Sequence, residues 1–145
     1  MNITSGQDTN FDGVTTSDRP NQIADWHMPG HRTLAQKAAG FFNTGAFAAV
    51  PAGTATGLGT TSAYLIVGPG KVSTDLAAAK SFSVWRESKV QFRADAFNAF
   101  NHVNLGNPNV SAVFNAAGAQ TSATFGTITG AAAGRILQLS LKLSF

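Results

Sequence analysis

The chain has 145 residues, a length that accommodates at most one domain. Charged residues make up only 12% of it and apolar residues 43%, which excludes a disordered, solvating segment. The net charge of +3 comes from basic residues scattered singly, so no basic stripe indicates a nucleic-acid partner. Because the sequence contains no cysteine, a disulfide framework and a thiolate metal site are both excluded.

Residues 1–71 are predicted to form a long irregular segment. Turn formers such as Pro29-Gly30 and Gly68-Pro69-Gly70 interrupt it throughout, and its short apolar clusters lack the length or period of a helix. Such a stretch is uncommon in a compact soluble domain but is typical of the extracellular loops of a large barrel. The first residues resemble no signal peptide, so we expect the chain to be the C-terminal piece of a longer protein.

A calcium-loop pattern lies near the start of this segment. The run DTNFDG at residues 8–13 matches the beginning of the pattern, in which alternate side-chain oxygens surround a tight turn. Arg19 stands where the pattern requires a bidentate Glu, and the neighbouring Asp18 is a candidate substitute. The candidate ligands of this structural calcium are Asp8, Asn10, Asp12 and Asp18. The alternative interpretation is an Asx-rich surface turn without an ion.

Three later segments alternate apolar and polar residues with the period of two that strands require. We predict strands over residues 72–84, 89–100 and 135–145, a short turn at 85–88, and a further short strand at about 123–129. Each long segment is near the length that crosses a bilayer at a tilt. The side chains predicted to face lipid are Val90, Phe92, Ala94, Ala96, Leu137, Leu139, Leu141 and Leu143.

The last segment shows the alternation without a fault, from Leu137 to Phe145. A strand that is apolar on one side and hydrated on the other suits the wall of an outer-membrane barrel, although a soluble sandwich also uses such strands. Short turns belong to the periplasmic side of a barrel and long loops to the outside, so we place residues 1–71 and 102–134 outside. Lys80 departs from this pattern, because it shares parity with apolar side chains. We expect its ammonium to reach the headgroups, or a bulge to turn it away.

These observations predict an all-β fold class. The chain would provide the C-terminal antiparallel strands of a transmembrane outer-membrane β-barrel, with long irregular extracellular loops and too few strands to close. Residues 1–71 form the loop-like part of this partial domain, and residues 72–145 hold the last three strands with the loop at 102–134.

A family resemblance rests on an ordered set of short motifs. The set comprises DRPN at 18–21, FNTGAF at 42–47, GPG at 68–70, VQFRADAFNAFNH at 90–102, GNPN at 106–109 and FGTI at 125–128. In this order they resemble the C-terminal barrel of TonB-dependent outer-membrane receptors, most closely the Oar-like branch with a carboxypeptidase-regulatory-like domain. One departure is TTSAY at 60–64, where the family often has an Arg-Asn pair.

The resemblance implies energised import of a scarce ligand across the cell outer membrane. The plug, the TonB-contacting segment and most of the barrel are missing from this sequence, so the chain would supply closing strands without transporting alone. Phe145 resembles the terminal aromatic residue of the barrel-assembly signal. The implied partners are the lipid bilayer, the barrel-assembly machinery, and the remaining barrel and plug through which TonB acts.

No enzyme motif accompanies these features. The sequence lacks a G-x-S-x-G nucleophile motif, and Glu87 is its only glutamate, so a paired-carboxylate hydrolase is not supported. Asp25, His27 and His31 form a weak candidate loop metal site. We therefore expect no enzyme and no cofactor beyond the candidate calcium. Two alternatives stay open, a soluble secreted calcium-binding or adhesive β-module and a small outer-membrane adhesin.

Overall fold

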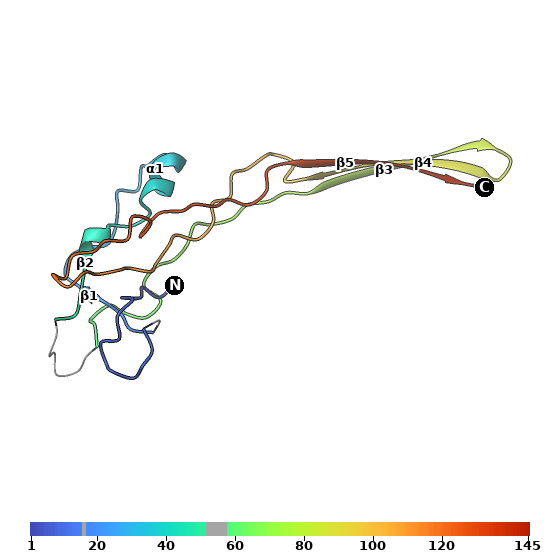
Figure 1. Cartoon of the computed structure of the whole chain (residues 1–145). Helices are drawn as coiled ribbons and strands as arrows, with labels where there is room; N and C mark the ends of the chain where they lie inside the picture. Colours follow the sequence, from blue (N-terminus) through green and yellow to red (C-terminus); the bar gives the residue numbers. More distant parts are fainter. Residues whose placement is uncertain (16, 52–57) are drawn as a thin grey trace. The chain divides into compact units, whose positions relative to one another are not determined.

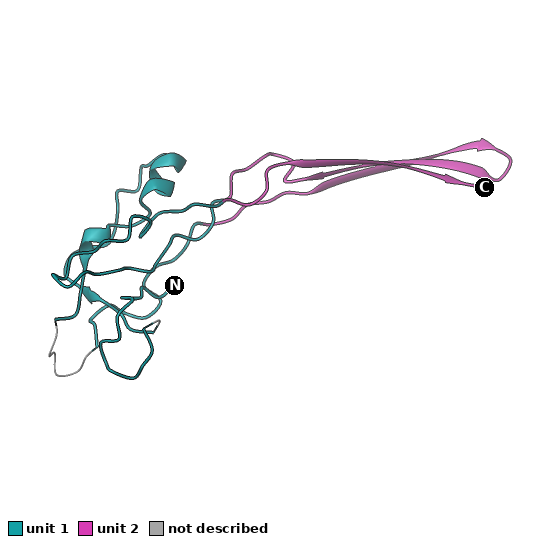
Figure 2. Ribbon diagram, in the orientation of Figure 1, with its two compact units in different colours: residues 1–69, 105–130 teal, residues 70–104, 131–145 magenta. Residues whose placement is uncertain are grey.

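The structure is a computed structural model that describes residues 1–15, 17–51 and 58–145. Within these ranges the chain forms five strands, one α-helix and one 3-10 helix (Figure 1). None of the helices in the described ranges has the length and hydropathy needed to cross a membrane. The chain folds as two compact units, each assembled from two separate stretches of sequence (Figure 2).

Unit 2, residues 70–104 and 131–145, is built on one antiparallel sheet. Its strands β3 (Leu76–Trp85), β4 (Ser88–Phe97) and β5 (Ile136–Ser144) lie side by side in that order (Figure 1). β4 pairs on both sides, whereas within the described residues β3 and β5 pair only with β4. The sheet is therefore open at both edges, and the predicted antiparallel all-β fold is confirmed.

The pairing register carries the alternation of side chains across the sheet. Val90 stands opposite Leu143 and Phe92 opposite Leu141, whereas Gln91, between them, stands opposite Lys142. Paired residues in an antiparallel sheet point to the same face, and neighbours along one strand point to opposite faces. The register therefore collects most apolar side chains on one face and most polar side chains on the other, with Phe97 and Ile136 as an apolar pair on the polar face.

Local backbone conformation sets the strand ends near the turns. β4 ends at Phe97, three residues before the predicted end, because Asn98 has a φ of 49°, in the left-handed region that interrupts a strand. The hairpin turn begins with Arg86, whose φ is 46°. Just before it, the register shifts between Ser83 and Trp85, which indicates a β-bulge at the end of β3.

Unit 1, residues 1–69 and 105–130, contains little regular structure. Its elements are the paired strands β1 (Asn21–Gln22) and β2 (Phe47–Ala48), the helix α1 (Leu34–Ala39) and the 3-10 helix η1 (Thr44–Ala46). The sequence analysis missed α1, although Thr33 and Gln36 form a capping box at its start. The predicted long irregular loops are confirmed.

The prediction of a short strand at about residues 123–129 is wrong. Residues 123–126 form a turn instead, and Gly126 has a φ of 80° that a strand does not accommodate. The apolar residues that suggested a strand, Phe125 and Ile128, are buried. Their burial explains the apolar pattern without any strand pairing.

An aromatic cluster joins the two stretches of unit 1. Phe42 and Phe47, from the first stretch, pack edge to face against Phe125 of the second, with ring centroids 5.1 and 6.0 Å apart. The other buried members of this core are Ile3, Ala46, Ile66, Ala112 and Phe114. The segment that precedes β3 and the segment between β4 and β5 therefore share one hydrophobic core.

Gly59 offers a test of this packing. A Cβ atom at this position would lie 2.0 Å from the backbone oxygen of Arg19, and the same turn of chain is held by the Thr61 hydroxyl, which donates to the Pro20 carbonyl oxygen at 2.6 Å. Gly59→Ala should therefore force the backbone apart and lower the free energy of unfolding by about 1–3 kcal/mol. Denaturant unfolding followed by circular dichroism measures the loss.

Gly30→Ala is the matched control, because a Cβ atom there meets nothing within 4 Å. This exposed substitution should change the free energy of unfolding by less than about 0.5 kcal/mol. Equal effects of the two substitutions would contradict the close packing at Gly59.

Candidate functional site

One face of the β3–β4–β5 sheet is apolar. The eight side chains predicted to face lipid all lie on it, namely Val90, Phe92, Ala94 and Ala96 from β4 and Leu137, Leu139, Leu141 and Leu143 from β5. The four leucines are between 59% and 73% exposed, so no described part of the chain covers them. Contact of this face with lipid stays a prediction. An uncovered apolar surface of this kind marks an interaction site.

β3 extends the apolar face but adds a charge. Leu76, Ala78 and Phe82 continue the face, whereas Lys80, on the same face, stands opposite Phe92. The bulge lies beyond Lys80 along the strand, so the proposed explanation that a bulge turns Lys80 away is wrong. The lysine instead remains within the apolar face.

The bulge changes the face of Trp85. Simple alternation along β3 would place Trp85 with Ser83 on the polar face. After the register shift, Trp85 pairs with Ser88, which shares its face with Val90. Bulges re-aim side chains in this way. Trp85 therefore belongs to the apolar face, at its turn end, and is 72% exposed.

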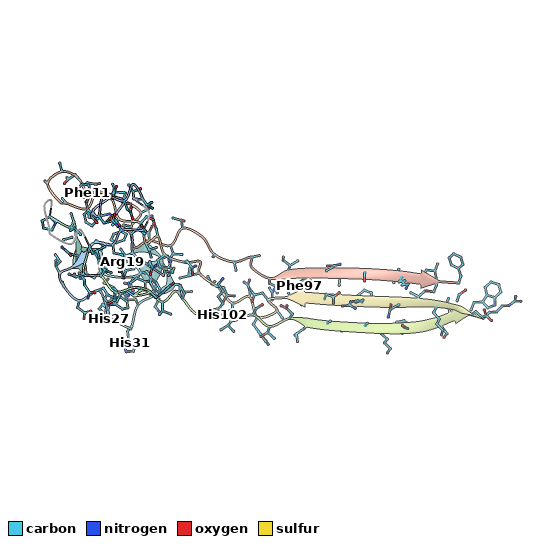
Figure 3. All side chains as sticks on the ribbon, turned by 90° about the horizontal axis from the view of Figure 1, so that it is seen from below. Phe11, Arg19, His27, His31, Phe97 and His102 are labelled. Atoms are coloured by element: carbon cyan, nitrogen blue, oxygen red, sulfur yellow. The ribbon has the colours of Figure 1, made fainter. Side chains whose placement is uncertain are left out.

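The opposite face is polar, and Figure 3 shows side chains projecting from both faces of the sheet. Its polar members are Ser81, Ser83, Lys89, Gln91, Arg93, Asp95, Gln138, Ser140, Lys142 and Ser144. On this face Arg93 pairs with Asp95, since the guanidinium donates to the carboxylate at 2.8 Å from both Nε and Nη2. These two charges therefore compensate each other, whereas Lys89 and Lys142 add positive charge to the same face.

Asparagine side chains tie the chain together where the sheet ends. Asn98 accepts from the backbone N–H of His102 and donates to the carbonyl of the same residue, both at 2.9 Å. Asn104 binds Val72 in the same two-way manner at 2.7 Å. The sequence signal for this turn-forming role at the strand end is asparagine at every third position from Asn98 to Asn107.

The four candidate calcium ligands bond within the chain. Asp8 and Asn10 both accept the backbone N–H of Asp12 at 3.1 Å, the hydrogen bonds of an Asx-rich turn. Asp18 is buried, and its carboxylate accepts from the Thr9 hydroxyl at 3.0 Å. In the described ranges, no three His, Cys, Asp or Glu residues form a group suited to a metal ion. The binding of a structural calcium ion by these residues stays a prediction.

The second candidate metal site is brought together only in part. His27 Nδ1 lies 2.6 Å from Asp25 Oδ1, and the His27 ring stacks on Trp26 with centroids 3.9 Å apart. The His27 backbone N–H, followed by its imidazole, holds the pKa of the Asp25 carboxyl below its ordinary value. Figure 3 labels His27 and His31, which both belong to unit 1. The arrangement orients a single histidine.

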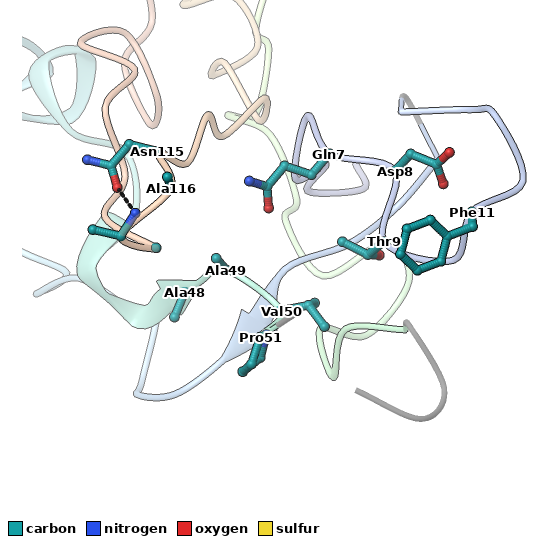
Figure 4. Close-up of a pocket in the computed structure, with 12 residues that line it drawn as sticks. Gln7, Asp8, Thr9, Phe11, Ala48, Ala49, Val50, Pro51, Asn115 and Ala116 are labelled. Atoms are coloured by element: carbon teal, nitrogen blue, oxygen red, sulfur yellow. Dashed lines mark hydrogen bonds between the residues drawn. The ribbon is translucent and has the colours of Figure 1, made fainter. Parts of the chain in front are cut away.

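Unit 1 also contains a cavity of about 780 Å³ (Figure 4). It lies between the 7–11, 48–51 and 115–118 segments, and its described lining is largely small and apolar. Asp8 is the one charged residue in that lining, and its carboxylate is already engaged in the turn described above.

The wall of a membrane β-barrel is an antiparallel sheet with one apolar and one polar face. Residues 1–138 match the family model described as outer membrane beta barrel domain, and the chain therefore belongs to this family. Searches of curated proteins and of solved structures gave no match. Membership confirms the predicted outer-membrane β-barrel and its place in the cell outer membrane.

Cysteine reactivity tests the two faces directly, because the chain has no cysteine of its own. In membrane-inserted protein, a thiol introduced by Lys142→Cys should react with a water-soluble maleimide about tenfold faster than one introduced by Leu141→Cys, because only a hydrated thiol ionises readily. These neighbours lie on opposite faces of β5, so each controls for the other. Equal labelling rates would contradict the assignment of one face to lipid.

Proposed function

We propose that the chain supplies closing wall strands of a TonB-dependent outer-membrane receptor similar to the Oar-like branch. Membership of the outer membrane β-barrel domain family supports the coarser part of this proposal. The ordered motifs from residue 18 to residue 128 support the finer part. The observation that carries the proposal is the two-faced sheet, in which eight apolar side chains from β4 and β5 face one side.

The open edges of the sheet support a role as part of a larger barrel. This sheet has three strands in the described residues, whereas the smallest membrane barrels use about eight strands and plugged transporters about 22. We infer that β3 and β5 each pair with a further strand, and that a plug in the lumen contacts TonB. The role of the chain is then architectural, without enzymatic activity, and its partners include the bilayer and the barrel-assembly machinery.

The lengths of the connections support an orientation. Two residues, Arg86 and Glu87, connect β3 to β4, and short connections belong to the periplasmic side of such barrels. We therefore place the hairpin turn in the periplasm and unit 1 outside the cell. In this orientation β5 descends toward the periplasm, where Phe145 is available as the assembly signal.

The alternatives fit these observations less well. A soluble calcium-binding or adhesive module would have to cover the apolar face, yet Leu141 is 73% exposed. A complete small barrel or adhesin would need further long strands, and the strands described in unit 1 have two residues each. A role as part of a larger barrel requires neither a covered apolar face nor further long strands within unit 1.

Heat modifiability on a gel tests whether the 145-residue chain closes a barrel by itself. A closed barrel resists detergent and migrates differently before and after boiling, whereas a sheet with two unpaired edges has no such resistance. We expect one unchanged position for the isolated chain. A heat-modifiable band from the isolated chain would overturn the proposal.

The coding sequence that precedes Met1 tests the TonB-dependent part. We expect an open frame continuous with the chain, encoding a plug and many more alternating segments. Expression of that longer frame should produce a heat-modifiable band. A stop codon directly upstream in the same frame would refute the receptor assignment.

A further inference from the structure

Two cation–π contacts lie between the middle of β3 and the hairpin turn. The Lys80 ammonium lies 5.3 Å from the centroid of the Phe82 ring, and the Arg86 guanidinium lies 5.6 Å from that of Trp85. Both distances are within the range at which an aromatic face attracts a cation. We call these four residues the β3 basic–aromatic cluster. Lys80, Phe82 and Trp85 all belong to the apolar face, because the bulge turns Trp85 onto it.

The depth of Lys80 in the apolar band determines how unfavourable its charge is in contact with lipid. Trp85 lies five positions further along β3, which is about 16 Å along a strand and about 12 Å of depth at the usual barrel tilt. That depth is near the middle of an apolar band about 25 Å tall, where a lysine facing lipid is most unfavourable. Because Phe82 lies two residues nearer the turn, the contact with its ring shows that the Lys80 side chain leans toward the turn.

The charges of the cluster are not balanced within the chain. Glu87 is the one acidic residue in the hairpin turn, beside Arg86 and close in sequence to Lys89. In the described part of the chain, the salt bridges join Asp25 to His27 and Arg93 to Asp95, and involve none of the cluster. Within the described residues, both basic groups of the cluster therefore stand outside any salt bridge.

We propose that the β3 basic–aromatic cluster binds the phosphate group of an anionic phospholipid, in the leaflet at the turn end of the sheet. The Arg86 guanidinium presents a fork of N–H donors that matches phosphate oxygens, and the Lys80 ammonium adds a point charge from the apolar side. The acyl chains of the same lipid would cover Phe82 and its neighbours. This inference rests on the proposed function, because it requires the apolar face to contact lipid.

Vesicle flotation tests the proposal with the full chain. The chain is reconstituted with vesicles of phosphatidylcholine alone or with added phosphatidylglycerol, and the preference is the ratio of the two bound fractions. Lys80→Met and Arg86→Gln should each lower that ratio about fivefold, the effect of one basic residue at an anionic surface. Lys80→Arg should preserve it. The matched control is Lys142→Met, which removes the same charge from the polar face and should leave the ratio unchanged.

Each other outcome overturns the inference. Equal losses from Lys80→Met and Lys142→Met would show a diffuse attraction to negative surface, and no loss from either cluster variant would show that the cluster does not bind lipid. Abolition of the preference by inorganic phosphate, at constant ionic strength, would assign the site to a free anion. If the unmodified chain binds neither kind of vesicle, the proposed membrane wall itself fails. Equal binding of the unmodified chain to both kinds of vesicle is a different result, because it would overturn the lipid preference and leave the membrane wall in place.

Discussion

The register of β5 against β4 is the constraint on which the two-faced sheet depends. Ala94 stands opposite Leu139, and the next pair along is Asp95 with Gln138. Side chains alternate along a strand, so a slip of one residue would carry every leucine of β5 to the polar face. The ladder of backbone hydrogen bonds therefore determines which side chains lie on each face, although the backbone groups themselves do not make either face apolar or polar.

The strands were predictable because their signal is local and periodic. An alternation of apolar and polar residues is sufficient to identify β3, β4 and β5 within a few residues and to assign their faces. The exceptions occur at single residues with unusual backbone conformations. Asn98 ends β4 early because its φ is positive. The bulge before Arg86 places Trp85 on the apolar face, whereas simple alternation along β3 would place it on the polar face. Hydropathy contains no information about either conformation.

Unit 1 was less predictable because its order comes from distant contacts. Phe42 and Phe125 pack together although more than eighty residues separate them in sequence, and neither lies in a periodic segment. The candidate calcium loop shows the same limit on a smaller scale. Its residue types matched a metal pattern, but Asp8 and Asn10 both accept the backbone N–H of Asp12. Short polar side chains serve a turn as readily as an ion.

The odd number of strands in the sheet limits how it can associate with itself. β3 and β5 both run antiparallel to β4, so the two outermost strands point in the same direction. Identical copies inserted the same way across a membrane would meet with parallel neighbours at every junction, where antiparallel membrane barrels have none. Only an odd complement of additional strands seals the cylinder with antiparallel seams throughout. Homotypic rings of this sheet are thus disfavoured by direction alone, whatever their side chains.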